Sequence, residues 1–377
     1  MLPVDEVIPE FLSALAEKGA AVLVAPPGAG KTTRVPLALL DQDWAADKRI
    51  IVVEPRRLAA RAPAAFMART LGETAGQTVG YRVRLDTKVS SATRIEMVTA
   101  GVFVRMILDD PELAGIAAVL FDEVHERSLD ADLGLALAID ARTALREDLR
   151  LAVMSATVDG ARYAALLDGA RVIESEGRMF PVETIYLGSD RDRRLEDRMA
   201  AAVRRGLGDQ PGSILAFLPG QAEILRTAER LRADVADNVD IAPLYGALDV
   251  KAQDLAIRPA GVGRRKVVLA TSIAETSLTI EDIRVVIDAG RARRARFDPG
   301  SGMSRLVTER VSKAEATQRA GRAGRVAPGD AYCLWTKGEH GALPAYAPPE
   351  IEAADLTGLA LELAVWGSDD LAFLTPA

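Results

Sequence analysis

Covalent cross-links and metal clusters are the first features that this sequence lacks. Its 377 residues include one cysteine, Cys333, which excludes an intramolecular disulfide. The sequence has only two histidines in addition to that cysteine, and so few candidate ligands argue against a structural zinc site. No apolar run approaches the roughly 20 residues of a membrane span, and no basic segment followed by an apolar one stands at the N-terminus. These absences predict a cytoplasmic protein with no membrane partner, and we expect it to be a monomer.

The composition that remains is that of a folded chain with an acidic balance. Hydrophobic residues make up 49% and charged residues 27%, and the length exceeds that of one ordinary core, so we expect two domains. The net charge of −7 argues mildly against a nucleic-acid partner, because neutralising phosphates needs Lys and Arg. Local basic clusters nevertheless stand at residues 56–57, at Arg82 with Arg84, and at residues 291–296. A chain that is acidic overall can still bind nucleic acid in one groove.

A glycine-rich turn between a predicted strand and a predicted helix is the most informative stretch. It reads Ala-Pro-Pro-Gly-Ala-Gly-Lys-Thr over residues 25–32, after the apolar run 21–24 and before a helical pattern that begins near Thr33. In this setting, backbone N–H groups and the helix dipole surround a phosphate. Lys31 would reach the β- and γ-phosphates, and the Thr32 hydroxyl would bind Mg²⁺. The alternative is a glycine-rich turn without a ligand. The candidate nucleotide contacts are Pro27, Gly28, Ala29, Gly30, Lys31, Thr32 and Thr33.

Apolar runs alternate with amphipathic stretches along most of the chain. Continuous β-branched runs separated by helices indicate an α/β fold with parallel sheets covered on both faces. The alternation pauses in a polar connector after residue 175 and then restarts, which predicts two such domains in tandem. The predicted strands are 21–24, 50–54, 94–99, 119–122 and 151–155, then 214–218, 239–243, 266–271 and 285–288. The predicted helices include 57–70, 101–108, 133–145, 221–232 and 350–366, and residues 292–308 read as a hairpin with a Pro-Gly turn.

Two acidic residues follow one of the predicted strands. Asp122, Glu123 and His125 come directly after the apolar run 118–121, at a strand end that faces the same crevice as the phosphate loop. Asp122 would hold Mg²⁺ through a water molecule, and Glu123 would orient and polarise the attacking water. A helix N-cap is the alternative reading of such an acidic pair. With the phosphate loop, the pair predicts an Mg²⁺ site made of Thr32, Asp122 and Glu123.

An arginine-rich segment near the C-terminus completes the candidate chemistry. Residues 318–325 read Gln-Arg-Ala-Gly-Arg-Ala-Gly-Arg, with small residues that let Arg322 and Arg325 project together. Arginines of this kind stabilise charge on a phosphoryl group in transfer, and Gln318 could hold the water. A basic, solvated loop is the alternative.

In their order along the chain, these segments resemble the motifs of the DEAH-box helicases of superfamily 2, most closely the bacterial HrpB type. The resemblance covers nearly the whole chain, and the most specific stretch is Thr-Ser-Ile-Ala-Glu-Thr-Ser-Leu-Thr-Ile at residues 271–280. The matching segments are 25–32 (motif I), 54–60 (Ia), 98–101 (Ib), 122–125 (II), 155–157 (III), 217–221 (IV), 270–280 (V) and 318–325 (VI).

The resemblance implies two RecA-like domains, 1–178 and 179–347, with ATP in the cleft between them. Residues 348–377 would be the first helix of a winged-helix region, so we expect the chain to be part of a longer one. ATP and Mg²⁺ would be the cofactors, and hydrolysis would open and close the domains. The implied catalytic residues are Lys31, Glu123, Gln318, Arg322 and Arg325, with His125, Ser155 and Thr157 coupling hydrolysis to movement.

The resemblance also implies a track for single-stranded RNA, with movement from 3′ to 5′ and the 292–308 hairpin as a wedge. Contacts of this kind grip the backbone, so they give little sequence preference. In other family members, two side chains stack on either side of the nucleotide base. This sequence has Phe66 and Ile257 at those positions, which predicts weak selectivity for the base. Glu281 and Asp282 follow motif V, and the preference for RNA over DNA stays open. The implied nucleic-acid contacts are Arg56, Arg57, Arg84, Thr99, Gly220, Thr271 and Thr276.

The sequence leaves three alternatives to a helicase open. A clamp that remodels RNA without unwinding would keep its ATPase activity and lose nothing when the hairpin is deleted. A kinase or metabolic ATPase of the phosphate-loop class would show no stimulation by nucleic acid. An inert scaffold is disfavoured because Lys31, Glu123, Arg322 and Arg325 are all intact.

Overall fold

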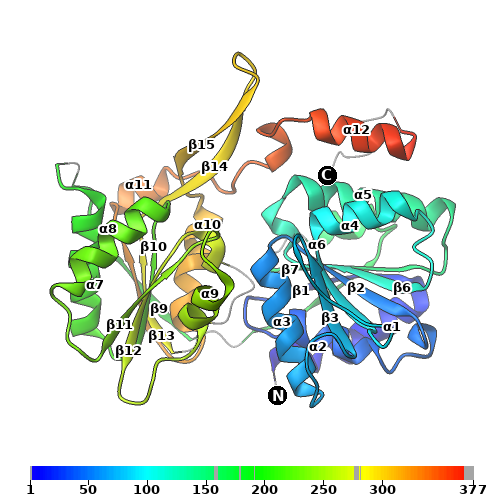
Figure 1. Ribbon diagram of the computed structural model, residues 1–377, viewed down its shortest axis with the longest axis horizontal. Helices are drawn as coiled ribbons and strands as arrows, with labels where there is room; N and C mark the ends of the chain where they lie inside the picture. The colour runs from blue at the N-terminus through cyan, green and yellow to red at the C-terminus, as the bar shows by residue number, and fades with distance from the viewer. Residues whose placement is uncertain are drawn as a thin grey trace. The chain divides into compact units, whose positions relative to one another are not determined.

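Two sheets, in which most neighbouring strands are parallel, organise the chain in the computed structural model (Figure 1). The structure describes residues 2–156, 160–177, 180–190, 192–275, 280 and 282–368, and the side chain of Leu58 lies outside the description. One unit contains Met1–Gly177 with Pro349–Ala377, and the other contains Arg178–Pro348. Each unit has its own sheet with helices against it, so the predicted α/β fold is confirmed.

The sheet of the first unit has eight strands in the order β4-β3-β5-β2-β6-β7-β1-β8. All neighbours pair in parallel except β3 and β4, which pair antiparallel. The central strand β6 is buried at all six positions, which explains its continuous apolar sequence. The strands are β1 (Ala20–Val24), β2 (Arg49–Glu54), β3 (Val79–Val83), β4 (Asp86–Lys88), β5 (Ile95–Thr99), β6 (Ile116–Phe121), β7 (Arg150–Ser155) and β8 (Arg171–Glu174).

Helices cover both faces of this sheet. Phe11, Leu39 and Met67 of α1, α2 and α3 enter one apolar core, whereas α4, α5 and α6 build another. In the second core, Phe103 meets Phe121 edge to face at 5.3 Å between ring centroids. The helices are α1 (Ile8–Lys18), α2 (Lys31–Leu39), α3 (Arg57–Thr70), α4 (Ala100–Asp109), α5 (Leu129–Ala144) and α6 (Gly160–Leu166), with short 3₁₀ turns at η1 (Pro3–Glu6), η2 (Asp43–Ala45) and η3 (Val124–Glu126).

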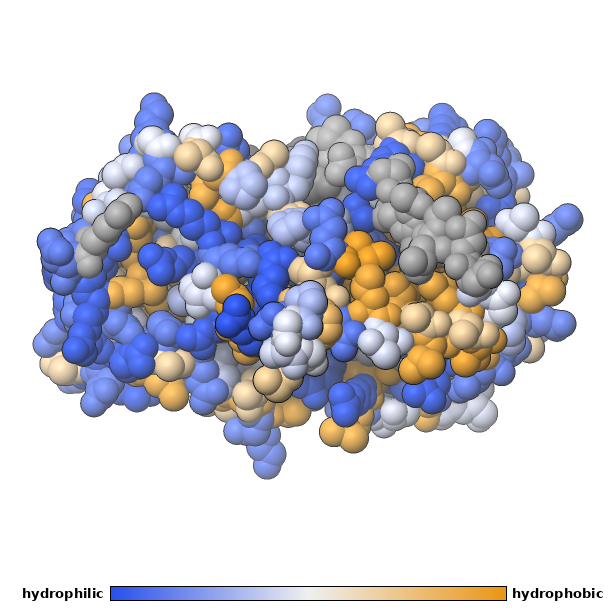
Figure 2. Space-filling view, turned by 90° about the horizontal axis from the view of Figure 1, so that it is seen from above, coloured by the Kyte–Doolittle hydropathy of each residue, from blue (hydrophilic) through white to orange (hydrophobic). Residues whose placement is uncertain are grey.

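The C-terminal segment packs on the first unit. It contains η6 (Glu350–Glu352) and α12 (Thr357–Trp366), and Leu359 and Leu363 join the core beside α4 and α5. The indole of Trp366 donates to Asp140 Oδ2 at 2.8 Å. Two apolar side chains of α12, Leu361 and Val365, remain 65% and 71% exposed, and Figure 2 shows hydrophobic residues on the side of this unit that carries α12.

The sheet of the second unit is parallel throughout, with the order β11-β12-β10-β13-β16-β9. Met199, Val203 and Ile224 of α7 and α8 pack on one of its faces. Its strands are β9 (Val182–Tyr186), β10 (Ser213–Phe217), β11 (Val239–Leu244), β12 (Arg265–Ala270), β13 (Ile283–Asp288) and β16 (Gly329–Cys333). Its helices are α7 (Leu195–Asp209), α8 (Gln221–Arg232), α9 (Val250–Ile257), α10 (Lys313–Gly321) and α11 (Lys337–Gly341), with η4 (Ser272–Ala274) and η5 (Arg322–Gly324).

A two-stranded ribbon projects from the second unit, as the sequence predicts (Figure 1). Its strands are β14 (Arg291–Asp298) and β15 (Met303–Arg310), and Arg291 and Arg310 face each other at its base. Asp298 closes the tip, because its Oδ1 accepts the Gly300 N–H at 3.1 Å and its Oδ2 accepts the Ser301 hydroxyl at 3.0 Å.

Candidate functional site

The carboxyl ends of five strands in the first unit meet at one edge of the sheet. Strands β1, β2, β5, β6 and β7 run in parallel, so the segments that follow them lie together. The backbone joins these ends, since the Ala25 N–H donates to the Ser155 carbonyl and the Asp122 N–H donates to the Val53 carbonyl, both at 3.0 Å. This edge gathers the phosphate loop, the acidic pair and Ser155, which are far apart in the sequence.

The phosphate loop has the backbone conformation that its glycines predict. Gly28 and Gly30 have φ angles of 87° and 96°, in the left-handed region that glycine adopts without strain. A Cβ atom on Gly30 would also lie 2.6 Å from Leu2 Cδ1. Helix α2 begins at Lys31 directly after Gly30, two residues earlier than the sequence pattern suggests. Pro27, Ala29, Thr32 and Thr33 lie in this loop and in the first turn of the helix.

Lys31 reaches the acidic pair across 92 residues of sequence. Its Nζ lies 2.8 Å from Glu123 Oε1 and 3.6 Å from Asp122 Oδ1. The Thr32 hydroxyl donates to Asp122 Oδ2, and Asp122 Oδ1 accepts the Glu123 N–H at 2.8 Å. Lys31, Asp122 and Glu123 are 4%, 2% and 3% exposed. Glu123 has a φ of 52°, an uncommon backbone conformation for a side-chain-bearing residue and one that recurs at functional sites.

Negative charge outweighs positive charge in this buried cluster. Burial by itself would lower the pKa of Lys31, but the carboxylates of Asp122 and Glu123 outweigh burial and raise it. Burial raises the pKa of Asp122. Burial and the nearby carboxylates of Asp122 and Glu123 also raise the pKa of Glu54, which lies at the end of β2. Three buried carboxyl groups therefore face one ammonium group. Such a site fits a divalent cation, and the Thr32 hydroxyl and the Asp122 carboxylate are oxygen ligands of the kind that Mg²⁺ prefers.

His125 links the acidic pair to the end of the neighbouring strand. Its Nδ1 accepts a hydrogen bond from the Ala156 N–H at 3.4 Å and lies 3.4 Å from Glu123 Oε2. Both contacts are made by the same ring nitrogen, so His125 connects the Glu123 carboxylate with the backbone that follows β7. Ser155 is fully buried beside this contact. Thr157, the third predicted coupling residue, lies outside the described residues.

In the arginine-rich segment, Arg319 and Arg322 are buried, whereas Gln318 and Arg325 are half-buried. Arg319 is 1% exposed, pairs with Glu275 and with Asp288 at 2.8 Å, and lies 4.9 Å from the centre of the Phe217 ring. This arginine is part of the core, and the sequence pattern alone does not set it apart from the others. Arg322 donates from Nε to the Glu275 carbonyl at 2.8 Å, and Arg322 and Arg325 line one small cavity. Gln318 lies half-buried on α10.

The predicted nucleic-acid contacts follow strand ends in both units. In the first unit, Arg56 pairs with Glu126 at 3.0 Å, Arg57 and Arg84 are exposed, and Thr99 is the N-cap of α4. In the second unit, Gly220 and Thr271 follow β10 and β12 and begin α8 and η4. A Cβ atom on Gly220 would lie 2.2 Å from Arg293 Nη1, so a larger residue here would make this arginine side chain of the ribbon move aside. Thr276 and Glu281 lie outside the described residues.

Comparison with known proteins agrees with this arrangement. A family model described as "DEAD/DEAH box helicase" matches residues 5–166, and one described as "Helicase conserved C-terminal domain" matches residues 198–327. The ATP-dependent RNA helicase HrpB of Escherichia coli is 51% identical over 98% of this chain. This chain belongs to the DEAD/DEAH box helicase family. The fission-yeast pre-mRNA-splicing factor ATP-dependent RNA helicase prp22 is 36% identical over 98% of the chain. A crystal structure of the E. coli DEAH/RHA helicase HrpB superimposes over the whole chain with a TM-score of 0.94 and 50% identity.

These comparisons confirm the resemblance and the fold drawn from the motifs. The chain spans 46% of the E. coli relative, 32% of the yeast relative and 48% of the E. coli structure, so it corresponds to half or less of each. Within the described ranges of this family member, no helix is long and apolar enough to cross a membrane.

Proposed function

We propose that the chain is an ATP-driven helicase that moves from 3′ to 5′ along single-stranded RNA and separates duplexes. The observation that carries this proposal is the buried contact of Lys31 and Thr32 with Glu123 and Asp122, which brings a phosphate loop and a pair of acidic residues together. The names of the relatives, ATP-dependent RNA helicases, support the same reaction and substrate. We further propose that the protein acts as a monomer in the cytoplasm and that it uses ATP with Mg²⁺.

The first unit would bind the nucleotide and prepare the water. Lys31 would exchange Glu123 for the β- and γ-phosphates, and Glu123 would then be free to accept a proton from the attacking water. Thr32 and Asp122 would hold Mg²⁺, which supplies neutralisation of phosphate charge when it is bound. Backbone N–H groups of the loop between Pro27 and Thr33 would surround the phosphates.

The second unit would supply the groups that complete hydrolysis. Arg322 and Arg325 would stabilise charge on the phosphoryl group in transfer, and Gln318 would hold the water. Hydrolysis would then depend on residues of both units. An RNA strand that binds both units could therefore control the rate of hydrolysis. Arg56, Arg57, Arg84, Thr99, Gly220, Thr271 and Thr276 are the proposed contacts to that strand, and DNA is a second candidate strand.

Replacing His125 by alanine is expected to weaken the link between hydrolysis and movement. The variant loses the acceptor of the Ala156 N–H but leaves the Lys31–Glu123 and Thr32–Asp122 contacts in place. ATP affinity should therefore be retained, while the number of duplexes separated per ATP hydrolysed should fall several-fold. The matched control is His340→Ala, which changes the only other histidine and lies in the second unit. An unchanged ratio of unwinding to hydrolysis in His125→Ala would contradict this coupling role.

Shortening the ribbon is expected to separate unwinding from hydrolysis. Arg294 and Val307 face each other across β14 and β15, so a two-residue Asn-Gly turn can join them and leave the base intact. We expect the rate of strand separation on a 3′-tailed RNA duplex to fall by roughly tenfold or more, because the ribbon would no longer hold the duplex in position. RNA-stimulated ATPase activity should stay near that of the intact chain.

The same assay distinguishes the second candidate function, remodelling of RNA without processive unwinding. If the intact chain hydrolyses ATP with RNA yet separates no duplex, remodelling is the better description. If the shortened ribbon unwinds as fast as the intact one, the ribbon is not the wedge.

A further inference from the structure

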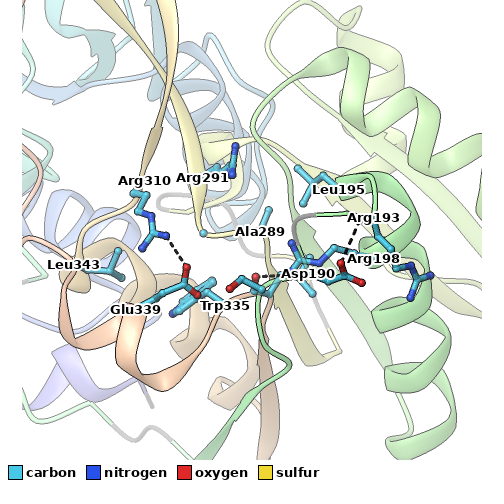
Figure 3. Close-up of a pocket in the computed structure, with 13 residues that line it drawn as sticks. Asp190, Arg193, Leu195, Arg198, Ala289, Arg291, Arg310, Trp335, Glu339 and Leu343 are labelled. Atoms are coloured by element: carbon cyan, nitrogen blue, oxygen red, sulfur yellow. Dashed lines mark hydrogen bonds and ion pairs between the residues drawn. The ribbon is translucent and has the colours of Figure 1, made fainter.

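The second unit contains a cavity of about 530 Å³ that the reaction described above does not use (Figure 3). It lies where β13 ends and β14 begins, beside the N-terminus of α7 and the segment before α11. Its volume falls in the range of sites that bind ligands of nucleotide size. Its charged lining residues are Asp190, Arg193, Arg198, Arg291, Arg310 and Glu339.

Positive charge exceeds negative charge in this cavity, although the whole chain has a net charge of −7. Four arginines face two carboxylates, which leaves a formal charge of +2. Arg310 forms an ion pair with one of these carboxylates, because its Nη2 lies 2.7 Å from Glu339 Oε1. The Glu339 carboxylate also accepts the Thr336 N–H, and hydrogen bonds from Thr336, Ser189 and Arg310 lower its pKa to about 2, so it is ionised.

The other three arginines form no ion pair in the described part of the chain, since the second carboxylate, Asp190, accepts the backbone N–H groups of Asp192 and Arg193. Arg198 donates to the carbonyls of Gly188 and Leu334 at 2.7 and 2.6 Å, which fixes its guanidinium without cancelling its charge. Burial lowers the pKa of Arg198, with the charges of Arg291 and Arg193 acting in the same direction and the carboxylates of Asp190 and Glu339 acting against it. Within the described ranges, the guanidinium groups of Arg193 and Arg291 make no hydrogen bond or ion pair. The cavity therefore has free donors and an unbalanced positive potential.

Two further features favour an anion here. Helix α7, of 15 residues, begins at Leu195 in the cavity wall, and the positive end of its dipole lies there. Its first-turn acids are occupied elsewhere, since Glu196 pairs with Arg226 and Asp197 with Arg230. Trp335 lines the cavity at 6% exposure and makes part of its wall apolar.

We infer that this cavity binds a phosphate of the nucleic-acid strand at the base of the ribbon. The inference rests on the proposed function and adds a contact that the family motifs do not include. Arg291 and Arg310 are the first and last residues of the ribbon and face each other, so a strand that passes the ribbon also passes the cavity. The arginine fork matches phosphate oxygens, and the cavity is much larger than a single free ion requires.

The test compares two double variants of the chain. Arg193→Gln with Arg291→Gln removes two exposed guanidinium groups that make no hydrogen bond or ion pair with the described residues, so folding should be unaffected. Arg232→Gln with Arg258→Gln removes two exposed arginines of the same unit that do not line the cavity. Binding of a fluorescent single-stranded RNA is measured by anisotropy between about 50 and 200 mM salt. Melting temperature and ATPase activity without RNA are measured on the same samples.

We expect the cavity variant to lose roughly tenfold in affinity at low salt and about 0.7 in the slope of log affinity against log salt, because each phosphate neutralised on a single strand contributes about 0.7. The control variant should lose little of either. RNA binding by the cavity variant that equals that of the control would overturn the inference and leave the proposed function standing. Failure of the unaltered chain to bind RNA would overturn the proposed function instead.

Two competitors identify the ligand. At constant ionic strength, inorganic phosphate should not displace the RNA from the unaltered chain, because the strand makes several contacts and the ion makes one. Displacement by phosphate would assign the cavity to a free anion. An acidic peptide that displaces RNA from the control variant more readily than from the cavity variant would assign it to a protein segment. Either result would overturn the inference.

Discussion

Replacing Glu123 by glutamine is expected to reduce the rate of ATP turnover by roughly 10²- to 10⁴-fold, the range for loss of a general base. Glutamine has the same shape, so the contact of Oε1 with Lys31 Nζ at 2.8 Å can be kept, but an amide cannot accept a proton from water. Binding of ATP should persist, because Lys31 and Thr32 are unchanged. Turnover is measured by phosphate release and binding with a fluorescent ATP analogue.

The matched control for this variant is Glu147→Gln. Glu147 is exposed in the same unit and does not take part in the buried cluster. The control should hydrolyse ATP at the rate of the unaltered chain. Near-normal turnover in Glu123→Gln would show that another group activates the water, and loss of ATP binding would show that Glu123 mainly holds Lys31 in place.

Alanine at Arg322 or at Arg325 is expected to lower turnover by about 10³-fold or more, as for arginines that stabilise a phosphoryl group in transfer. The half-buried Arg325 gives the simpler test, since Arg322 also donates to the Glu275 carbonyl and is 3% exposed. ATP affinity and melting temperature should change much less than the rate for Arg325→Ala. A loss below tenfold in both variants would contradict the assigned role.

Arg319→Met is the contrasting variant within the same segment. Arg319 pairs with Glu275 and Asp288 in the core, so its removal leaves two buried carboxylates without their cation. Breaking such a group costs about 3–5 kcal/mol of folding free energy, so this variant should melt early. In this segment, Arg319 would thus stabilise the fold, whereas Arg322 and Arg325 would act in ATP hydrolysis. Equal melting of all three variants would contradict this division.

Local patterns in the sequence predict the strand ends and the loops that follow them. The glycine conformations after β1 and the acidic pair after β6 depend on neighbouring residues alone, and the parallel order of the strands then brings them together. Strands β3, β4, β8, β9 and β16 are not among the predicted strands, because each mixes polar with apolar residues and lacks a continuous apolar run like that of β6. They are recognisable only from their partners in the sheet.

Long-range contacts account for what the sequence did not predict. Arg319 pairs with the carboxylates of Glu275 and Asp288, which come from other segments of the second unit, whereas Arg322 donates only to the Glu275 carbonyl among the described contacts. The arginine-lined cavity likewise combines residues from Ser189 to Leu343 that no motif groups. Pairing of Lys31 with Glu123 is implied by the motifs, but its distance and burial follow only from the sheet.

The most direct test of the account is the ATPase rate of the chain with and without single-stranded RNA. We predict that RNA raises the rate several-fold, that Glu123→Gln and Arg325→Ala each abolish the stimulated rate, and that added salt reverses the stimulation. Single-stranded DNA in a parallel assay ranks the two polymers. An ATPase rate that is the same with RNA, with DNA and with neither would contradict a nucleic-acid motor and favour an ATPase with a small substrate.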